Sequence, residues 1–442
     1  MGSLRESRHG RLITITGPVL SGKKTYLERL LNSAHGTIWK KGKNHDTIVL
    51  AKHPKDGARS PGKIRSYDAL ETTDPDEIAD LIKPNTEAVM ISGINFFPRK
   101  IIDLLQAVVA SNRLVYVSGL NLNWKGEPYN FMPEIMALSD EILLTRAPCM
   151  EPGCQRVATR SEKIDERPRG RRRVCIDDHD FKGRPSPKHF LKRQTGGLEL
   201  FVGNMFASKS TTWRERMREL DANGIEYVVF KWLKDKRYKE RDEDYVPFGK
   251  GEIGFNNSDE KIPAITVRNM DDILKYLDGE TRIKEVDEKS RKRKLGHVFI
   301  DEGQFIAGIS EKVRERMYQG YKFYITGLMR DFRMLPFKEM ANLLALADTI
   351  NIMHAYCVLC GREASESQRL VKKNGKWSPA HFKGDKVVVG GKGEGKTVTD
   401  AYEARCIDCI KVSGAPKPKY IFQRYKPPKT RKEARRLMRE MQ

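Results

Sequence analysis

Residues 297–305 read HVFIDEGQF, a short apolar run that ends in two adjacent carboxylates. The run at 298–300 has the length of a parallel strand that is covered on both faces. Ligands of such sheets bind beyond the carboxyl ends of the strands, so Asp301 and Glu302 are expected at the mouth of a site. An acid there can hold the magnesium that accompanies a nucleoside triphosphate. The alternative is two solvated acids at a strand end, which a short motif does not exclude.

Residues 198–211, LELFVGNMFASKST, precede this stretch and resemble a strand that runs into a phosphate loop. The spacing Gly203-x₄-Ser208-Lys209-Ser210 keeps the lysine and the hydroxyl of such a loop, in which backbone N–H groups surround phosphate oxygens. Ser208 stands where the motif has glycine. If that position needs a positive φ, its Cβ costs on the order of 1 kcal/mol.

A similar loop begins the chain at residues 11–25, RLITITGPVLSGKKT. An apolar strand leads into Gly17-x₄-Gly22-Lys23, which predicts phosphate binding. Lys24 stands where the motif calls for the Ser or Thr that ligates magnesium, so metal binding by this loop is in doubt. Further strands are predicted at 87–97 and 114–120, and helices at 26–31 and 74–81.

Landmarks of these segments recur in one order along the chain. The matching pairs are Gly17 with Gly203 at an offset of 186, Ser92 with Asp301 at 209, Gly119 with Gly327 at 208, and Cys149 with Cys357 at 208. A nearly constant offset over the later landmarks predicts duplicated domains, with about twenty extra residues in the middle of the second copy.

Composition limits the function classes. The 442 residues, 39% of them hydrophobic, suffice for two or three domains with real cores. A net charge of +23 suits polyanions such as nucleotides or nucleic acid, although a solubilising basic surface is the alternative. No uncharged apolar run reaches the roughly 18 residues of a membrane span, and the first residues carry neither a signal-peptide core nor a myristoylation signal. A soluble, intracellular protein without membrane contact is expected.

Seven cysteines in such a chain are better explained as metal ligands or thiols than as disulfides. The pairs Cys357-x-x-Cys360 and Cys406-x-x-Cys409 have the spacing of a tetrahedral, closed and structural Zn²⁺ site. The first half holds a looser set, which either binds a second zinc or is incidental. Its members are Cys149, Cys154, Cys175 and His179.

The second half resembles the thymidine kinase family of animal cytosol, bacteria and large DNA viruses. The resemblance spans residues 196–411 and rests on GNMFASKST, KDKRY, FIDEGQF, GLMRDFRMLPF, LLALADTI, AYCVLCGREA, VVVGG and AYEARCIDC. The first half is similar at lower fidelity, through GPVLSGKKT, GLNLNWKGEPY and CMEPGCQRVATR. The resemblance implies a P-loop α/β domain that binds ATP, and a small zinc domain whose lasso closes over the nucleoside.

The resemblance also implies roles for single residues. Glu302 would be the general base for the nucleoside 5′-hydroxyl, while Lys209 and Arg237 neutralise the transferring phosphoryl group. Asp301 with Ser210 would hold Mg²⁺. The implied ATP- and magnesium-binding residues are Gly203, Ser208, Lys209, Ser210, Thr211 and Asp301. The implied nucleoside-binding residues are Met205, Leu328, Phe332, Phe337, Gly390 and Tyr402. As residue types alone, most of the latter are more often ordinary core.

Departures from the family pattern concentrate in the first half. Ser92 and Gly93 replace the acid pair, so that copy has no candidate base and is expected to be catalytically silent, packed on the active copy like a subunit of a family oligomer. In the second half Met329 replaces the usual aspartate, and residues 391–400 lengthen the lasso. The expected assembly is a homo-oligomer of such pseudo-dimeric chains, in the cytoplasm of a cell or encoded by a virus or phage.

The predicted fold class is α/β, with two tandem P-loop domains built on parallel sheets, each followed by a small zinc-ribbon-like or lasso subdomain. The expected boundaries are 1–180 for the first copy (10–146 and 147–180), 181–197 for the linker, 198–411 for the second copy (198–355 and 356–411), and 412–442 for a basic tail. The tail mixes basic residues with Tyr and Phe, so it either binds nucleic acid or is solvated, which is commoner.

Two functions stay open on the sequence. Intact Lys209, Ser210, Asp301 and Glu302 favour an ATP-dependent thymidine or related deoxynucleoside kinase, with ATP, Mg²⁺ and Zn²⁺ as cofactors. Ser208, the altered first copy and the charge favour an inactive protein of the same fold that binds nucleic acid or a larger assembly.

Overall fold

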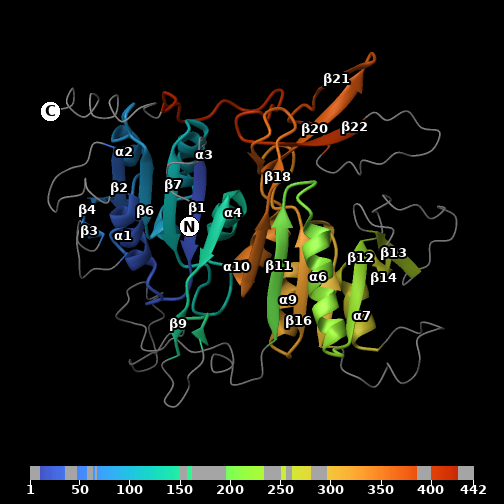
Figure 1. Ribbon diagram of the computed structural model, residues 1–442. Helices are drawn as coiled ribbons and strands as arrows, with labels where there is room; N and C mark the ends of the chain where they lie inside the picture. Colours follow the sequence, from blue (N-terminus) through green and yellow to red (C-terminus); the bar gives the residue numbers. More distant parts are fainter. Residues whose placement is uncertain are drawn as a thin grey trace.

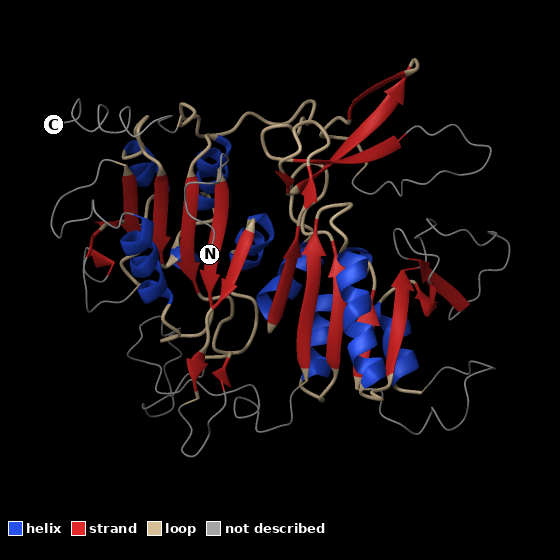
Figure 2. Cartoon of the chain, in the orientation of Figure 1, coloured by secondary structure: helices blue, strands red, loops and turns tan. Residues whose placement is uncertain are grey.

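The computed structural model describes residues 10–34, 47–56, 63–64, 67–149, 157–161, 196–232, 250–254, 261–279, 296–385 and 400–426. They form two α/β bodies, each with a mainly parallel sheet between helices, and a smaller β region beyond the second sheet (Figure 1, Figure 2). We call residues 10–161 the first half and residues 196–410 the second half. Among the described residues, no helix is long and apolar enough to cross a membrane.

The sheet of the first half has the order β5-β2-β6-β7-β1-β8, and its paired strands run parallel. Its strands are β1 (Arg11–Thr16), β2 (Ile48–Lys52), β5 (Leu70–Glu71), β6 (Ala88–Ser92), β7 (Leu114–Gly119) and β8 (Glu141–Leu144). Its helices are α1 (Lys23–Ala34), α2 (Pro75–Asp80), η1 (Ile94–Phe96), α3 (Ile101–Ala110) and α4 (Met132–Leu138). A two-stranded ribbon, β3 (Lys63–Ile64) with β4 (Tyr67–Asp68), lies beside it. The predicted strand at 87–97 ends early, because η1 follows it.

The sheet of the second half has the order β13-β14-β12-β15-β16-β11-β17. Its strands are β11 (Gly197–Gly203), β12 (Tyr227–Trp232), β13 (Lys250–Gly254), β14 (Lys261–Val267), β15 (His297–Ile300), β16 (Lys322–Gly327) and β17 (Thr349–Met353). Its helices are α6 (Lys209–Ala222), α7 (Met270–Leu277), η3 (Gly303–Phe305), α9 (Ile309–Met317) and α10 (Lys338–Leu346). Strand β13 pairs antiparallel with β14, an edge that the parallel prediction did not include.

The two sheets follow one plan. Without β13, the second order β14-β12-β15-β16-β11-β17 repeats the first strand by strand. The repeat extends to side chains at the same offsets, since the amide of Leu12 donates to Asp140 Oδ2 at 2.9 Å and that of Leu198 to Asp348 Oδ2 at 3.1 Å. The central strands are apolar and almost wholly buried, as predicted for strands with helices on both faces.

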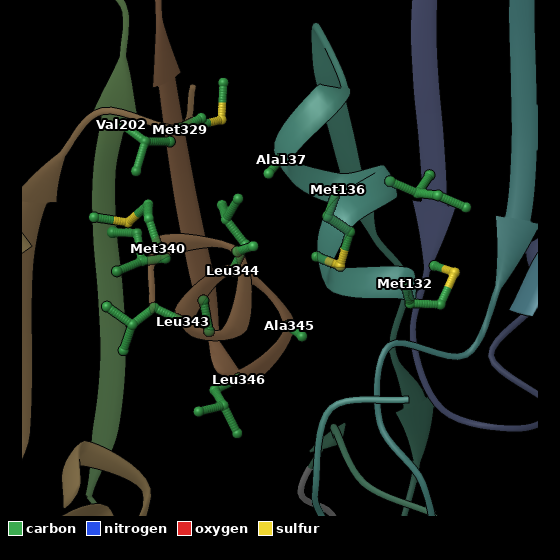
Figure 3. Packing of buried hydrophobic residues seen from close by; sticks show 14 of the residues in the cluster. Met132, Met136, Ala137, Val202, Met329, Met340, Leu343, Leu344, Ala345 and Leu346 are labelled. Carbon is green, nitrogen blue, oxygen red and sulfur yellow. The ribbon is translucent and has the colours of Figure 1, made fainter. Parts of the chain in front are cut away.

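The two halves pack through helices α4 and α10, whose apolar side chains join one hydrophobic cluster (Figure 3). The last carbonyl groups of a helix have no hydrogen-bond donor within the helix. In both α4 and α10, side chains of the other half donate to them. Arg330 donates to the carbonyls of Ala137 at 3.2 Å and Leu138 at 2.6 Å. In the opposite direction, Asn121 Nδ2 donates to the Ala345 carbonyl at 2.8 Å, and Arg160 to that of Leu346 at 3.2 Å. The contact is therefore reciprocal.

The smaller β region follows β17. It consists of the hairpin β18 (Ala355–Tyr356) with β19 (Glu363–Ala364), and of a sheet in the order β21-β20-β22. The strands of that sheet are β20 (Glu366–Lys373), β21 (Lys376–Pro379) and β22 (Asp400–Arg405). The first half has a matching hairpin, β9 (Ala147–Pro148) with β10 (Val157–Ala158).

Residues 411–425, which we call the strap, leave the second half and cross to the first (Figure 1). The amide of Tyr425 donates to the Ser111 carbonyl at 2.8 Å, and buried Arg113 donates to the Gln423 carbonyl at 2.8 Å. Tyr420 and Phe422 pack against the main core. The sequence predicts a solvated or nucleic-acid-binding tail from residue 412, whereas this part of the tail is docked on the first half. Residues 427–442 lie outside the described part of the chain.

Candidate active site and cysteine cluster

Two carboxylates stand at the end of β15, as the sequence predicts. Asp301 is 6% exposed, and its Oδ1 accepts from the Thr326 hydroxyl and, at 3.0 Å, from the amide of Glu302. The backbone of Glu302 is left-handed with φ 56°, a costly conformation for a side chain of this kind. Neighbouring hydrogen bonds therefore hold Glu302 at a fixed, strained strand end.

Gln304 orients the Glu302 carboxylate. Its Nε2 donates to Glu302 Oε2, and its Oε1 accepts from the amide of Leu328 at 3.1 Å. Gln304 is 7% exposed, so the amide is fixed from both sides. The carboxylate is partly buried and acceptor-only when ionised, which suits proton abstraction from a nearby hydroxyl.

The predicted phosphate loop of the second half connects β11 to α6. Gly203 has φ 158°, and a Cβ there would lie 2.1 Å from the Met353 carbonyl oxygen. Ser208 has φ 54°, so the non-glycine residue does occupy a left-handed position. Lys209 opens helix α6, and its Nζ donates to the Asn204 carbonyl at 2.7 Å. The loop and its lysine are thus formed beside the end of β11.

The implied nucleoside residues lie in different settings. Phe332 is buried between two guanidinium groups, with Arg369 5.3 Å and Arg333 5.8 Å from its ring centroid. Phe337 is buried and meets Phe305 edge-on, so part of its role is core packing. These contacts bring Phe332 to the smaller β region but leave Phe337 in the domain core.

The remaining implied positions are divided between loop and lasso. The Met205 amide donates to Ser367 Oγ on β20 at 3.0 Å, which joins the phosphate loop to the smaller β region. Tyr402 on β22 pairs with Arg369 on β20. Leu328 packs against the main cluster. Arg237 and Gly390 lie outside the described residues.

Sequence reasoning missed Arg369 as part of this site. Its guanidinium donates to Asp400 Oδ1 at 2.8 Å and to the Asp385 carbonyl at 2.7 Å, so it joins the two ends of the segment 386–399. The sequence signal is weak, since an arginine in an alternating strand normally faces solvent. Here the side chain is 8% exposed.

The four cysteines predicted to bind zinc meet in one place. Their sulfur atoms all lie within 4.8 Å of one another, and Cys360 and Cys406 are 3.6 Å apart. Tetrahedral zinc with bonds of about 2.3 Å places sulfurs about 3.8 Å apart, so the cluster fits the ion. The Arg362 guanidinium donates to Cys360 Sγ and lowers the pKa of that thiol to about 6. Cys149 is described, whereas Cys154, Cys175 and His179 lie outside the described residues.

A comparison with protein-family models matches residues 10–179 and 253–410 to thymidine kinase. The matched segments cover well over half of the 442 residues. The chain belongs to the thymidine kinase family. The second phosphate loop, residues 203–211, falls between the matched segments, and its assignment rests on the loop geometry described above.

Membership of the thymidine kinase family explains the fold and the cysteine cluster together. Thymidine kinases are phosphotransferases with a nucleoside substrate, and they imply ATP and Mg²⁺ as cofactors. The parallel-strand sheets are consistent with P-loop-like kinase domains, and the four-cysteine cluster suggests a zinc-binding subdomain.

Proposed function

We propose that the second half is an ATP-dependent deoxynucleoside kinase that phosphorylates the 5′-hydroxyl of thymidine. The observation that carries this proposal is Glu302, held in a left-handed backbone with its carboxylate oriented by Gln304. A strained and over-determined acid at a strand end is a feature of catalytic centres, and a structural acid has no need of it. Related deoxynucleosides are the alternative acceptors.

In this mechanism each group has one task. Glu302 removes the 5′-hydroxyl proton, the oxygen attacks the γ-phosphorus of ATP, and ADP leaves with the bond electrons. Lys209 and Arg237 neutralise the transferring phosphoryl group, and Asp301 with Ser210 would hold Mg²⁺, which would supply further positive charge to the phosphates. The loop backbone from Gly203 to Thr211 surrounds the phosphates, with Ser208 in the strained position.

Nucleoside binding is assigned to the surface between the phosphate loop and the smaller β region. Phe332 is buried under Arg333 and Arg369, so it would support these two arginines at the edge of the nucleoside site, and Tyr402 is paired with Arg369 across the β20–β22 ladder. Met205, Leu328, Phe337 and Gly390 complete the implied set. A structural zinc on Cys357, Cys360, Cys406 and Cys409 would fix the strand that carries Tyr402.

We further propose that the first half arose by duplication and does not transfer phosphate. The repeated strand order, the constant offsets and the matching Asp140 and Asp348 hydrogen bonds support duplication. Ser92 and Gly93 take the places of the acid pair, which removes the base. The packing of α4 on α10 then replaces, within one chain, a contact between two subunits. Such chains associate further into a homo-oligomer.

A second candidate is a thymidine-kinase-like protein without turnover that binds nucleic acid or a larger assembly. Ser208 favours it, because a side chain with φ 54° sits where phosphate must approach closely. The net charge of +23 favours it as well. Loss of binding with rising salt would then mark a nucleic-acid partner.

A phosphoryl-transfer assay separates the two candidates. Purified protein with ATP, Mg²⁺ and thymidine is expected to form thymidine monophosphate, and Glu302→Gln is expected to abolish turnover while ATP binding stays intact. Lys322→Gln, which removes an exposed charge at the amino end of β16, the opposite end of the strands from the acid pair, is the matched control. No product with any deoxynucleoside, or equal rates for wild type and Glu302→Gln, would overturn the kinase proposal.

A further inference from the structure

The phosphate loop of the first half keeps the backbone shape of the second. Gly17 has φ 152° against 158° for Gly203, and Leu20 has φ 57° against 67° for Phe206. The lysine is also placed alike, since Lys23 Nζ donates to the Pro18 carbonyl at 2.6 Å and Lys209 Nζ to the equivalent Asn204 carbonyl at 2.7 Å. The acid pair is lost from this half, but the phosphate loop remains formed.

Lys24 occupies the place of the magnesium ligand Ser210, and it carries a charge of its own. Its ammonium lies 3.2 Å from Asp56 Oδ1 and donates to the Asp56 carbonyl at 2.9 Å. An ammonium has three N–H donors, so these contacts leave one for a ligand oxygen. The pair is partly buried, with side chains 29% and 19% exposed.

Asp56 brings a carboxylate to the place of the lost acid pair, although it comes from a different part of the chain. It follows β2, and its Oδ2 accepts from the hydroxyl of Ser92, the residue that replaces Asp301. Gly93 replaces Glu302, and a Cβ on Gly93 would lie 2.4 Å from the Asp56 Cβ. The missing side chain therefore makes room for Asp56.

A buried donor in the same place has no partner. Asn95 is 1% exposed, and its Oδ1 accepts from the Leu120 amide at 3.0 Å, as Gln304 Oε1 does from Leu328. The Nε2 of Gln304 donates to Glu302, but Asn95 Nδ2 has no hydrogen-bond partner among the described residues. In the second half the equivalent amide nitrogen donates to Glu302, the residue that Gly93 replaces. Unsatisfied buried donors are rare, and a ligand oxygen would satisfy this one.

We propose that the first half holds a second phosphate-binding site, which takes the triphosphate chain of a nucleotide without a divalent cation. Lys24, held by Asp56, stands where the second half would place magnesium held by Asp301, and Lys23 and the loop amides bind the phosphates. A fixed ammonium repels a second cation, so magnesium gains no place there. This site is independent of the turnover proposed for the second half.

The test is calorimetric titration of ATP in EDTA into a Lys209→Ala variant, whose second loop is disabled. One ATP per chain is expected to bind, and magnesium is expected not to strengthen the binding. Adding Lys23→Ala should weaken it at least tenfold, and Lys24→Ser should make it depend on magnesium. Arg29→Ala, which removes an exposed charge from the same helix, is expected to bind ATP unchanged.

Two further measurements keep the proposal falsifiable. Inorganic tripolyphosphate in place of ATP shows whether the nucleoside part contributes to affinity. Photolabelling of the wild-type chain by 8-azido-ATP in EDTA, followed by peptide mapping, is expected to mark the first half even if Lys209→Ala fails to fold. No ATP bound in EDTA with no label in the first half, or binding that requires magnesium and survives Lys23→Ala, would overturn the site.

Discussion

Arg330 and Glu366 form an ion pair buried at the junction of the two halves. The guanidinium and the carboxylate are 2.7 Å apart, and each side chain is 5% exposed. Arg330 also donates to the carbonyls at the end of α4. Burial nevertheless raises the pKa of Glu366, although Arg330 opposes the shift. The contact between the halves thus depends on keeping a charge paired in the interior.

Arg330→Met is expected to destabilise the chain by about 3–5 kcal/mol, because it leaves Glu366 buried without its partner. Urea unfolding followed by circular dichroism measures the change. Arg330→Met with Glu366→Gln should recover part of the loss. Arg99→Met, which breaks the exposed pair with Glu134, should cost less than about 1 kcal/mol. Equal losses in both single variants would contradict this account.

The stability that is lost in Arg330→Met is expected to depend on pH. A carboxyl whose folded pKa is raised contributes stability while protonated, below its unfolded pKa, and loses that contribution as pH rises through the folded pKa. Removing Arg330 raises the pKa of Glu366 further. The deficit of Arg330→Met relative to wild type should therefore grow from acid toward neutral pH. A deficit that is constant over this range would show that Glu366 remains ionised.

Gln304→Ala is expected to lower kcat by about a hundredfold, the effect of a base displaced by about 1 Å. Gln304 fixes the Glu302 carboxylate and does not itself touch the phosphate loop. ATP affinity should stay within twofold of wild type, which titration can measure. A parallel loss of ATP binding would mean that Gln304 supports the whole domain and not the base alone.

Ser208→Gly should stabilise the protein by about 1 kcal/mol, since it removes a left-handed backbone cost. The expected sign is a higher melting temperature in scanning calorimetry. Ser210→Gly, two residues on in α6, is the matched control and should destabilise by about 0.5 kcal/mol, because glycine is a poorer helix residue than serine. A destabilised Ser208→Gly would show that the serine hydroxyl stabilises the loop.

Elemental analysis should find about one zinc per chain if only the described four-cysteine cluster is filled. About two would mean that Cys149, Cys154, Cys175 and His179 hold another. Cys406→Ser should weaken thymidine binding more than ATP binding, because Cys406 directly follows the strand of Tyr402. ATP binding should fall as well, but less, since Ala207 of the loop packs in one buried cluster with Cys406. No zinc, or equal loss of both ligands, would contradict the structural role.

A good part of the site could be predicted from the sequence because its signals are local. An apolar run that stops at Asp301 and Glu302 marks a strand end, and the glycines and lysines mark the loops. The position of Asp56 could not be predicted this way, because Asp56 follows another strand and only folding brings it next to Gly93. The glycine in the sequence does not indicate which residue fills the space beside it. The burial of Arg369 likewise depends on contacts between distant segments.

The docking of the strap could not be predicted from the sequence for a similar reason. Tyr420, Ile421 and Phe422 form a short apolar run, but the lysines and arginines around it are typical of a basic tail. Ile421, between those two rings, is 82% exposed. Tyr420 and Phe422 pack against the core while Ile421 faces solvent, so contacts with the first half decide which side chains are covered.

The docking of the strap also affects the order in which the chain folds during its synthesis. Ribosomes release a protein from its amino end, so Arg113 emerges about three hundred residues before the Gln423 carbonyl to which it donates. The first half therefore gains this hydrogen bond only after the strap has been synthesised. A chain cut short before the strap would lack this hydrogen bond, and quality-control proteases could recognise such a chain at the edge of the first half on which the strap docks.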